Sequence, residues 1–300
     1  MAAFAELHCH TNFSFLDGAS TVDELVERAV ELGLGGLAIT DHRGLYGAVR
    51  FVSAAESVGL HPVVGLEIEL IDALVADPAR VVVPARRPSR RRRGADGAAA
   101  AAAAGSGPAA GSPVRPRAHR ARLPGHREAV KEDLRGIGER QRGPHLVLLA
   151  RDVTGYRSLC RLVSYANLAG TKSMPRFSQA LLAAHTEGLV ALSGCRDGEI
   201  ARRLLVGDRD GARAAAEEYA RRFGGGARAD SVTTAGFALE LEHHLRPDDD
   251  WLVAETASLA AEIGLPVVVT NDVHYARREG RELHDVLTAI RHGRALDELR

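Results

Sequence analysis

Short apolar runs that follow amphipathic segments predict a repeated unit of helix and buried strand. In residues 21–32, apolar side chains recur three or four positions apart from Val22 to Val30, the spacing of a helix that packs on one side. Gly33 ends this segment. The all-apolar run 36–40 that follows predicts a short strand buried on both faces.

The same unit recurs three more times along the chain. The further helices are expected to begin near Leu45, Gln179 and Trp251, and the strands after them to span 63–66, 189–193 and 267–270. Additional strands are expected just before His8, at 146–150 and at 237–241. Buried strands that alternate with helices are typical of an α/β protein with a parallel sheet or barrel.

Side chains that can bind a metal follow most of these strands. They are His8 and His10 after the first strand, Asp41 and His42, Glu67, Cys195, and finally Asp272 and His274. The carboxyl ends of parallel strands meet at one rim of a barrel, so we expect these groups to converge there. Imidazole, carboxylate and thiolate together suit zinc, manganese or iron, and they outnumber the four ligands of one tetrahedral ion.

The two His-x-His-type spacings support this interpretation, because residues two apart on a strand share a face. His8 and His10 are so spaced, and so are Asp272 and His274. Cys9, between the first pair, is expected to face the core. The adjacent His243 and His244 would face opposite ways and are expected in a loop. The remaining histidines have no partner at ligand spacing: His61, His119, His126, His185, His284 and His292.

Residues 77–125 form a low-complexity segment rich in Arg, Ala, Pro and Gly. Between Arg80 and Arg127 there are twelve arginines and one acidic residue, Asp96. This composition favours a disordered insertion. It leaves open whether the segment is a phosphate-binding arm, a solvated loop or a stretch read out of frame.

Composition excludes several other classes of protein. Hydrophobic residues make up 45% and charged residues 26%, as in soluble globular proteins. No apolar run approaches the length of about 18 residues needed to cross a membrane, and the first residues lack the features of a signal peptide. We therefore expect a cytoplasmic protein with no membrane partner and with reduced cysteines. There is no phosphate-binding G-x-x-x-x-G-K-[ST] loop and no zinc-finger spacing.

The strand-end motifs resemble those of a known family. HCHTNFSFLDG at 8–18, ITDH at 39–42, GLE at 65–67, SGC at 193–195 and TNDVHY at 270–275 resemble the successive motifs of the PHP (polymerase and histidinol phosphatase) domain. More narrowly, residues 4–72 and 143–300 resemble the N-terminal PHP domain of bacterial C-family DNA polymerases. Residues 166–177 and 283–293 are most similar to the error-prone branch of that family.

This resemblance implies a distorted parallel (β/α)7-type PHP barrel with up to three divalent metal ions, zinc or manganese first and iron as an alternative. The implied ligands are His8, His10, Asp17, His42, Glu67, His145, Cys195, Asp272 and His274. Strand position alone would not have selected His145, which precedes its strand, and Asp17 could also be a turn residue. The catalytic groups would be His8, His10, Asp41, His42, Asp272 and His274. Because Asp41 precedes His42, it would be either an acceptor that orients an imidazole or a turn residue.

The resemblance also implies an activity and a division of the chain. A metal cluster of this kind hydrolyses phosphoesters, and the family implies a 3′–5′ exonuclease acting on a DNA 3′ end or primer-template in replication and damage-tolerant repair. We expect a PHP domain in two parts, 1–76 and 126–276, interrupted by the insertion 77–125. Residues 277–300 would begin the connection to the polymerase core of the full-length protein, which would hold the DNA-directed DNA polymerase activity. A free-standing histidinol-phosphatase-like enzyme and a non-catalytic scaffold are the alternatives.

Overall fold

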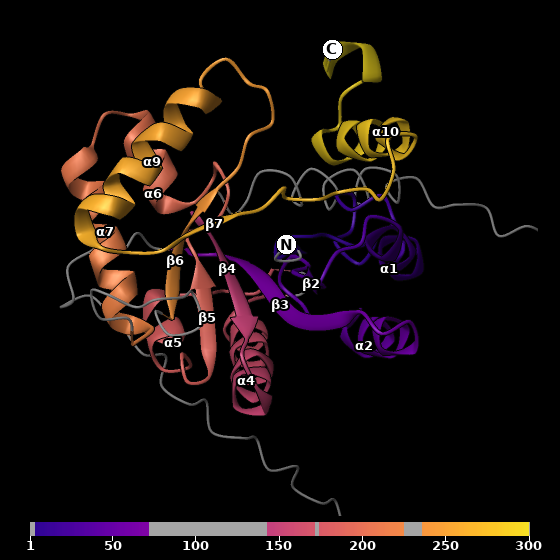
Figure 1. Ribbon diagram of the computed structural model, residues 1–300, viewed down its shortest axis with the longest axis horizontal. Helices are drawn as coiled ribbons and strands as arrows, with labels where there is room; N and C mark the ends of the chain where they lie inside the picture. The colour runs from indigo at the N-terminus through magenta and orange to yellow at the C-terminus, as the bar shows by residue number, and fades with distance from the viewer. Residues whose placement is uncertain (1–3, 72–142, 172–173, 225–235, 300) are drawn as a thin grey trace, which may run out of the picture.

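The computed structural model describes residues 4–71, 143–171, 174–224 and 236–299, and its strands form one curled sheet (Figure 1). Seven strands follow one another in chain order across the sheet: β1 (Ala5–Glu6), β2 (Gly36–Ile39), β3 (His61–Glu69), β4 (His145–Ala150), β5 (Leu189–Leu192), β6 (Phe237–Leu241) and β7 (Val267–Val269). The expected α/β fold and strand positions are confirmed. The predicted insertion at 77–125 lies outside the described residues.

One strand runs against the others. β4 is antiparallel to both β3 and β5, whereas all other neighbouring strands are parallel. The expected distorted parallel barrel is confirmed as a curled, mostly parallel sheet. The reversal of β4 was not part of the expectation, because an apolar run predicts a buried strand but not its direction. The reversal has a consequence for the site: it brings the start of β4, at His145, to the rim where the parallel strands end.

The rim joins the two edges of the sheet. The backbone N–H of His10 donates to the carbonyl of Val273 (2.7 Å), and the N–H of Val273 donates to the carbonyl of His8 (2.9 Å). Cys9 and Val273 form the corresponding parallel bridge. The segments after β1 and β7, which are more than 260 residues apart in sequence, therefore lie side by side.

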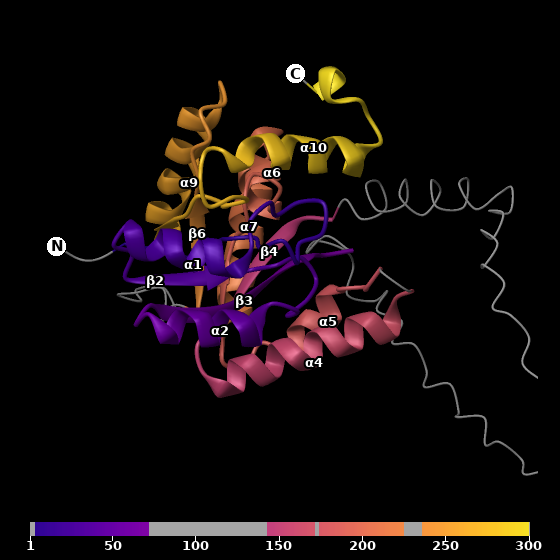
Figure 2. The ribbon, with the colours of Figure 1, turned by 90° about the vertical axis from the view of Figure 1, so that its right-hand side faces the viewer.

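The helices surround the sheet (Figures 1 and 2). They are α1 (Val22–Glu31), α2 (Ala48–Ser57), α4 (Val153–Ala169), α5 (Gln179–Ala183), α6 (Glu199–Leu205), α7 (Arg209–Arg222), α9 (Asp249–Ile263) and α10 (Gly280–His292), with the 3₁₀ helix η2 (Leu296–Leu299) after them. In Figure 1, α1 and α2 lie to the right of the sheet and α6, α7 and α9 to the left. None of these described helices combines the length and hydropathy that a membrane span requires.

Two apolar clusters lie between these helices and the sheet. The larger joins β3 to β6 with α4 to α7 and α9, and the smaller joins α1, α2 and β2. Cys9 is fully buried in the smaller cluster, as strand alternation predicted. A third group of small and aliphatic side chains lines the other face of the sheet, among them Ala38, Val147 and Leu192. This packing fixes the strand ends that carry the polar groups of the rim.

Candidate metal centre

The structure brings all nine predicted ligand side chains together at one rim. They form four overlapping groups, in each of which the potential ligand atoms lie within 4.8 Å of one another: His8, His10 and Asp272; His10, Asp17 and His274; His10, His42 and Glu67; Glu67, His145 and Cys195. Shared members make the groups one continuous cluster. His145 belongs to it because β4 runs in the reverse direction.

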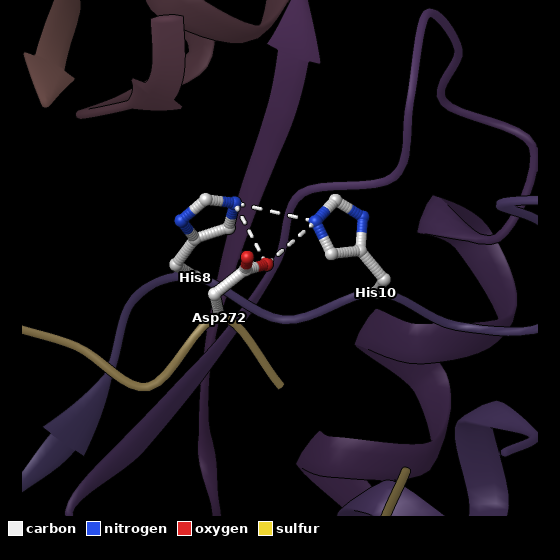
Figure 3. Close-up of side chains that lie close together, drawn as sticks. All are labelled: His8, His10 and Asp272. Atoms are coloured by element: carbon white, nitrogen blue, oxygen red, sulfur yellow. Dashed lines mark hydrogen bonds and ion pairs between the residues drawn. The ribbon is translucent and has the colours of Figure 1, made fainter. Parts of the chain in front are cut away.

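The group of His8, His10 and Asp272 has the spacing of a metal site (Figure 3). The Nε2 atoms of His8 and His10 are 3.2 Å apart, and Asp272 Oδ1 lies 3.5 and 3.2 Å from them. Ligand atoms about 2.0–2.2 Å from a tetrahedral zinc ion are roughly 3.3–3.6 Å apart. Two ring nitrogens and a carboxylate oxygen at these distances therefore fit one cation.

Glu67 connects this group to the remaining ligands. Its Oε2 lies 2.9 Å from His42 Nδ1 and 3.3 Å from His10 Nε2, and its Oε1 lies 2.5 Å from His145 Nδ1. The Cys195 Sγ is 3.5 Å from the same His145 nitrogen. A carboxylate with histidines on both oxygens is able to bridge two cations.

A glycine allows the loop of Cys195 to approach β4. Gly194 has a φ of 81°, and a Cβ at this position would lie 2.6 Å from the carbonyl oxygen of His145. Only glycine adopts this backbone conformation without steric cost. The Ser-Gly-Cys sequence therefore brings Cys195 next to His145.

Asp17 lies inside the cluster and is more than a turn residue. Its Oδ2 is 2.7 Å from His42 Nε2 and 3.1 Å from His274 Nε2. Its Oδ1 accepts a hydrogen bond from the guanidinium of Arg291, on α10. Burial raises the pKa of Asp17, but the hydrogen bonds from His274 and His42 outweigh it and hold the pKa far below its usual value.

Several atoms of the cluster lack a hydrogen-bond partner within the described part of the chain. They are Glu67 Oε1, Asp272 Oδ1 and His42 Nδ1, all buried. Each lies within 4 Å of an oppositely charged or ring-nitrogen neighbour, but without hydrogen-bond geometry. Buried polar atoms are rarely left unpaired. Groups that face a common space and do not bond one another fit the coordination of a cation.

The charges of the cluster favour a cation. Burial lowers the pKa of His8, but the carboxylates of Glu240 and Asp272 outweigh it and raise that pKa well above its ordinary value. Burial raises the pKa of Glu67, but His145 and His42 lower it far more. The carboxylates that favour a proton on these rings would favour a divalent ion in its place.

We predict that metal binding at pH 7 displaces a proton from His274. Its Nδ1 is 2.7 Å from the backbone oxygen of Asp272 and its Nε2 is 3.1 Å from Asp17, and an imidazole donates from both nitrogens only when protonated. Burial lowers the pKa of His274, but the hydrogen bond to Asp17 and the charge of Asp272 raise it to about 9. The ring is thus protonated at pH 7 in the metal-free protein, and a metal at Nε2 must replace that proton.

Calorimetric titration with zinc in buffers of different ionisation enthalpy measures this release. We expect about one proton or more per chain at pH 7, with a smaller release as the pH rises past about 9. Heats that are independent of the buffer would contradict the prediction.

The expectation that Asp41 orients an imidazole directly is corrected, and its alternative role as a turn residue agrees with the structure. Its carboxylate contacts no imidazole within the described chain; it accepts from the backbone N–H of Thr11 (2.7 Å) and from the hydroxyls of Thr11 (2.8 Å) and Ser14 (2.7 Å). Ser14 Oγ is in turn 3.2 Å from His10 Nδ1. Because Asp41 and His42 are adjacent, they point in different directions. Asp41 therefore shapes the turn behind His10 and lies outside the group of potential ligand atoms.

His243 and His244 lie in the loop after β6, as expected. His243 pairs with Asp250 at 2.8 Å, and His244 Nε2 is 2.9 Å from the backbone oxygen of Asn271. His284, which has no partner at ligand spacing in the sequence, lies beside the cluster, with its ring centroid 5.0 Å from that of His274. Burial and the charge of His274 lower the pKa of His284.

Sequence reasoning also missed two acidic residues and one arginine beside the cluster. Glu240 and Glu242 lie near the ring of His8, and Arg291 contacts Asp17. The Glu-Leu-Glu pattern at the end of an apolar strand has the same two-residue spacing as His8 and His10 and could have revealed the first two. The α10 residues His284 and Arg291 carry no such signal.

Comparison with known proteins places the chain in a family. A model of the PHP domain matches residues 6–244. The chain belongs to the PHP domain family. An error-prone DNA polymerase of Nocardia farcinica is 39% identical over 304 residues, covering 99% of this chain and 24% of that protein. DNA polymerase III subunit alpha is 31% identical in Treponema pallidum and 32% in Thermus aquaticus, covering 96% and 98% of this chain and 19% of each of those proteins.

The strand-end motifs resembled those of PHP domains from C-family DNA polymerases, and these relatives confirm that resemblance. The chain spans about a quarter or less of the length of these curated relatives. A PHP domain with a continuous cluster of histidine, carboxylate and thiolate groups is suited to hold divalent metal ions.

Proposed function

We propose that this PHP domain is a metal-dependent phosphoesterase. The observation that carries the proposal is the convergence of nine ligand-type side chains, some with unpaired buried atoms, at one rim of the sheet. His8, His10, Asp17, His42, Glu67, His145, Cys195, Asp272 and His274 would hold up to three divalent ions, with zinc or manganese favoured over iron. Bound ions of this kind supply a hydroxide at neutral pH and neutralise the charge of a phosphate ester.

The protein itself shapes an open cavity above this cluster. The cavity has a volume of about 1620 Å³ and is lined by His10, Asp17, His42 and Glu67, among others. On the sheet side, buried residues such as Cys9 exclude water from behind the ligands. A phosphate ester would thus approach only from the open side, toward the histidine and carboxylate groups.

We propose the 3′ end of DNA as the substrate, with hydrolysis of the 3′–5′ exonuclease type. The relatives named above are DNA polymerases. Three exposed aromatic side chains, Phe13 (38% exposed), Phe15 (72%) and Tyr46 (69%), line the cavity, and exposed aromatic rings stack on unpaired bases. In a protein as long as these relatives, the domain would act beside a polymerase core in replication and damage-tolerant repair in the cytoplasm.

Two of these rings lie close to glycines, where a larger residue would leave no room for them. A Cβ at Gly44 would lie 2.1 Å from Tyr46 Cε2, and one at Gly47 would lie 2.9 Å from Phe13 Cδ2. Each ring thus has one edge or face against the backbone of the loop after β2 while the rest is partly open.

The test is hydrolysis by the purified chain loaded with zinc or manganese. With a single-stranded oligonucleotide labelled at its 5′ end, we expect a ladder of products shortened from the 3′ end, which chelator abolishes. A primer-template should not be extended by these residues. If the chain cleaves neither the oligonucleotide nor bis-p-nitrophenyl phosphate, the proposed phosphoesterase activity is refuted. The non-catalytic scaffold is then the remaining alternative. Hydrolysis restricted to histidinol phosphate would favour the small-molecule phosphatase instead.

A further inference from the structure

Glu240, near the end of β6, contacts the ring of His8 on the side away from the cluster. His8 Nδ1 is 2.9 Å from Glu240 Oε1, whereas His8 Nε2 faces His10 and Asp272. Neither side chain is exposed to solvent. One ring nitrogen is therefore held by a carboxylate while the other points to the predicted metal site.

Neighbouring strands hold Glu240 in this position. The hydroxyl of Thr270, just after β7, donates to Glu240 Oε1 at 2.5 Å. The backbone N–H of Glu240 donates to the hydroxyl of Ser193, just after β5, at 2.9 Å. Thr270 thus holds the carboxylate, and Ser193 holds the backbone that carries it.

Glu240, and not its neighbour Glu242, is the partner of the ring. Glu242 Oε1 is 3.4 Å from His8 Nδ1, whereas Glu240 Oε1 is 2.9 Å from the same atom. A ring nitrogen carries one hydrogen, and the nearer, hydrogen-bonded acceptor is Glu240.

We propose that Glu240 is a positioning residue that fixes the tautomer of His8, with the hydrogen at Nδ1 and the lone pair at Nε2 facing the metal. Metal-bound histidines commonly donate their other N–H to a carboxylate, which orients the ring and makes it a stronger ligand. Glu240 would act through His8 and would touch neither metal nor substrate. This inference rests on the metal binding that underlies the proposed function.

A different role for Glu240 would give a different result. His8, Glu240 and Glu242 also lie close enough to one another to hold a cation of their own. If Glu240 is a ligand of a separate cation, its loss removes one bound ion even at saturating metal. If it positions His8, the number of ions at saturation is unchanged and only the affinity falls.

The experiment compares zinc affinity in the wild type and in Glu240→Gln, by competition with a chromophoric chelator. Glutamine keeps the shape of the side chain but removes its charge. We expect affinity about 10–100-fold weaker for at least one ion, with wild-type stoichiometry at saturation. A zinc affinity within threefold of the wild type would overturn the proposal, and so would the loss of one bound zinc ion per chain at saturation.

Glu6→Gln is the matched control. Glu6 is equally buried and also contacts His8, but it accepts from the backbone N–H (3.0 Å) and not from the ring. We expect wild-type affinity in this variant. An equal loss in both variants would show a general effect of buried charge and would overturn the proposal.

A second variant and a second readout cover the case in which Glu240→Gln does not fold. Thr270→Val removes the hydroxyl that holds Glu240 and should weaken zinc binding about fivefold, the effect of one hydrogen bond. In the zinc-loaded protein, nitrogen NMR of the imidazoles should show His8 protonated at Nδ1 and bound at Nε2, and the opposite tautomer would refute the proposal. Because neither readout needs turnover, a protein that binds zinc but hydrolyses nothing refutes only the proposed phosphoesterase.

Discussion

Replacing Asp272 with asparagine is expected to abolish phosphodiester hydrolysis and to remove bound metal. Asp272 Oδ1 lies 3.2 and 3.5 Å from the Nε2 atoms of His10 and His8 and is buried without a hydrogen bond among the described contacts. An amide has nearly the same shape but no charge to hold a divalent ion. Since a bound ion contributes several kcal/mol to catalysis, kcat should fall by at least about 100-fold.

Asparagine also suits the backbone at this position. Asp272 has a φ of 45°, a conformation that asparagine and aspartate tolerate better than other residues with side chains. The variant should therefore fold, which the circular dichroism spectrum of its metal-free form checks. Loss of activity can then be assigned to the metal site.

Asp285→Asn is the control for this prediction. Asp285 lines the same cavity, but its only described charged partner is Arg281, at 3.9 Å, and it lies outside the cluster. Wild-type activity and metal content are expected. If Asp272→Asn is also as active as the wild type, the hydrolysis comes from a contaminant or from another site.

Replacing Phe177 with alanine is expected to destabilise the fold by about 3–5 kcal/mol, the usual cost of removing a buried aromatic ring. Phe177 is fully buried in the larger apolar cluster. Its backbone carbonyl accepts from the N–H of Ile71 at 2.9 Å, which ties the segment before α5 to the residues after β3. Removing the ring would leave a cavity beside the strand that carries Glu67.

Urea denaturation of the metal-free protein measures this cost. Leu168→Ala is the control, because Leu168 belongs to the same sequence motif but is 81% exposed. Its free energy of unfolding should change by about 0.5 kcal/mol or less. If both variants lose a similar free energy of unfolding, the burial of the Phe177 ring does not explain its contribution to stability.

The positions of helices and strands were predictable because they depend on local patterns. The first predicted helix is one example: Thr21 caps α1 in a capping box with Glu24, and the apolar side chains of the stripe are buried. The rim was predictable as well, because the ends of parallel strands must meet. This is why His8, Glu67 and Asp272 could be chosen from strand position alone.

The direction of β4 could not be predicted in this way. An apolar run has the same pattern whether its strand is parallel or antiparallel to its neighbours. A parallel β4 would place His145 at the end of the sheet away from the cluster, so only the family resemblance selected this residue. Asp41 shows the opposite error. Its place beside His42 in sequence suggested a contact with an imidazole, but alternation turned it toward Thr11 and Ser14.

Residues that reach the cluster from distant segments were beyond sequence reasoning. Arg291 and His284 approach from α10, more than 250 residues after the first strand. Their positions follow from the path of the chain after β7, which no local pattern encodes. Glu240 was missed although its spacing from Glu242 was visible, because acidic pairs are common on exposed strand ends.

Anomalous X-ray diffraction from crystals of the zinc-loaded chain would show whether the rim binds metal. We expect anomalous peaks at the rim, one bounded by His8, His10 and Asp272 and another bounded by Glu67, His145 and Cys195. Crystals that contain zinc only at surface positions, with the nine side chains bonded to one another or to water, would contradict this expectation.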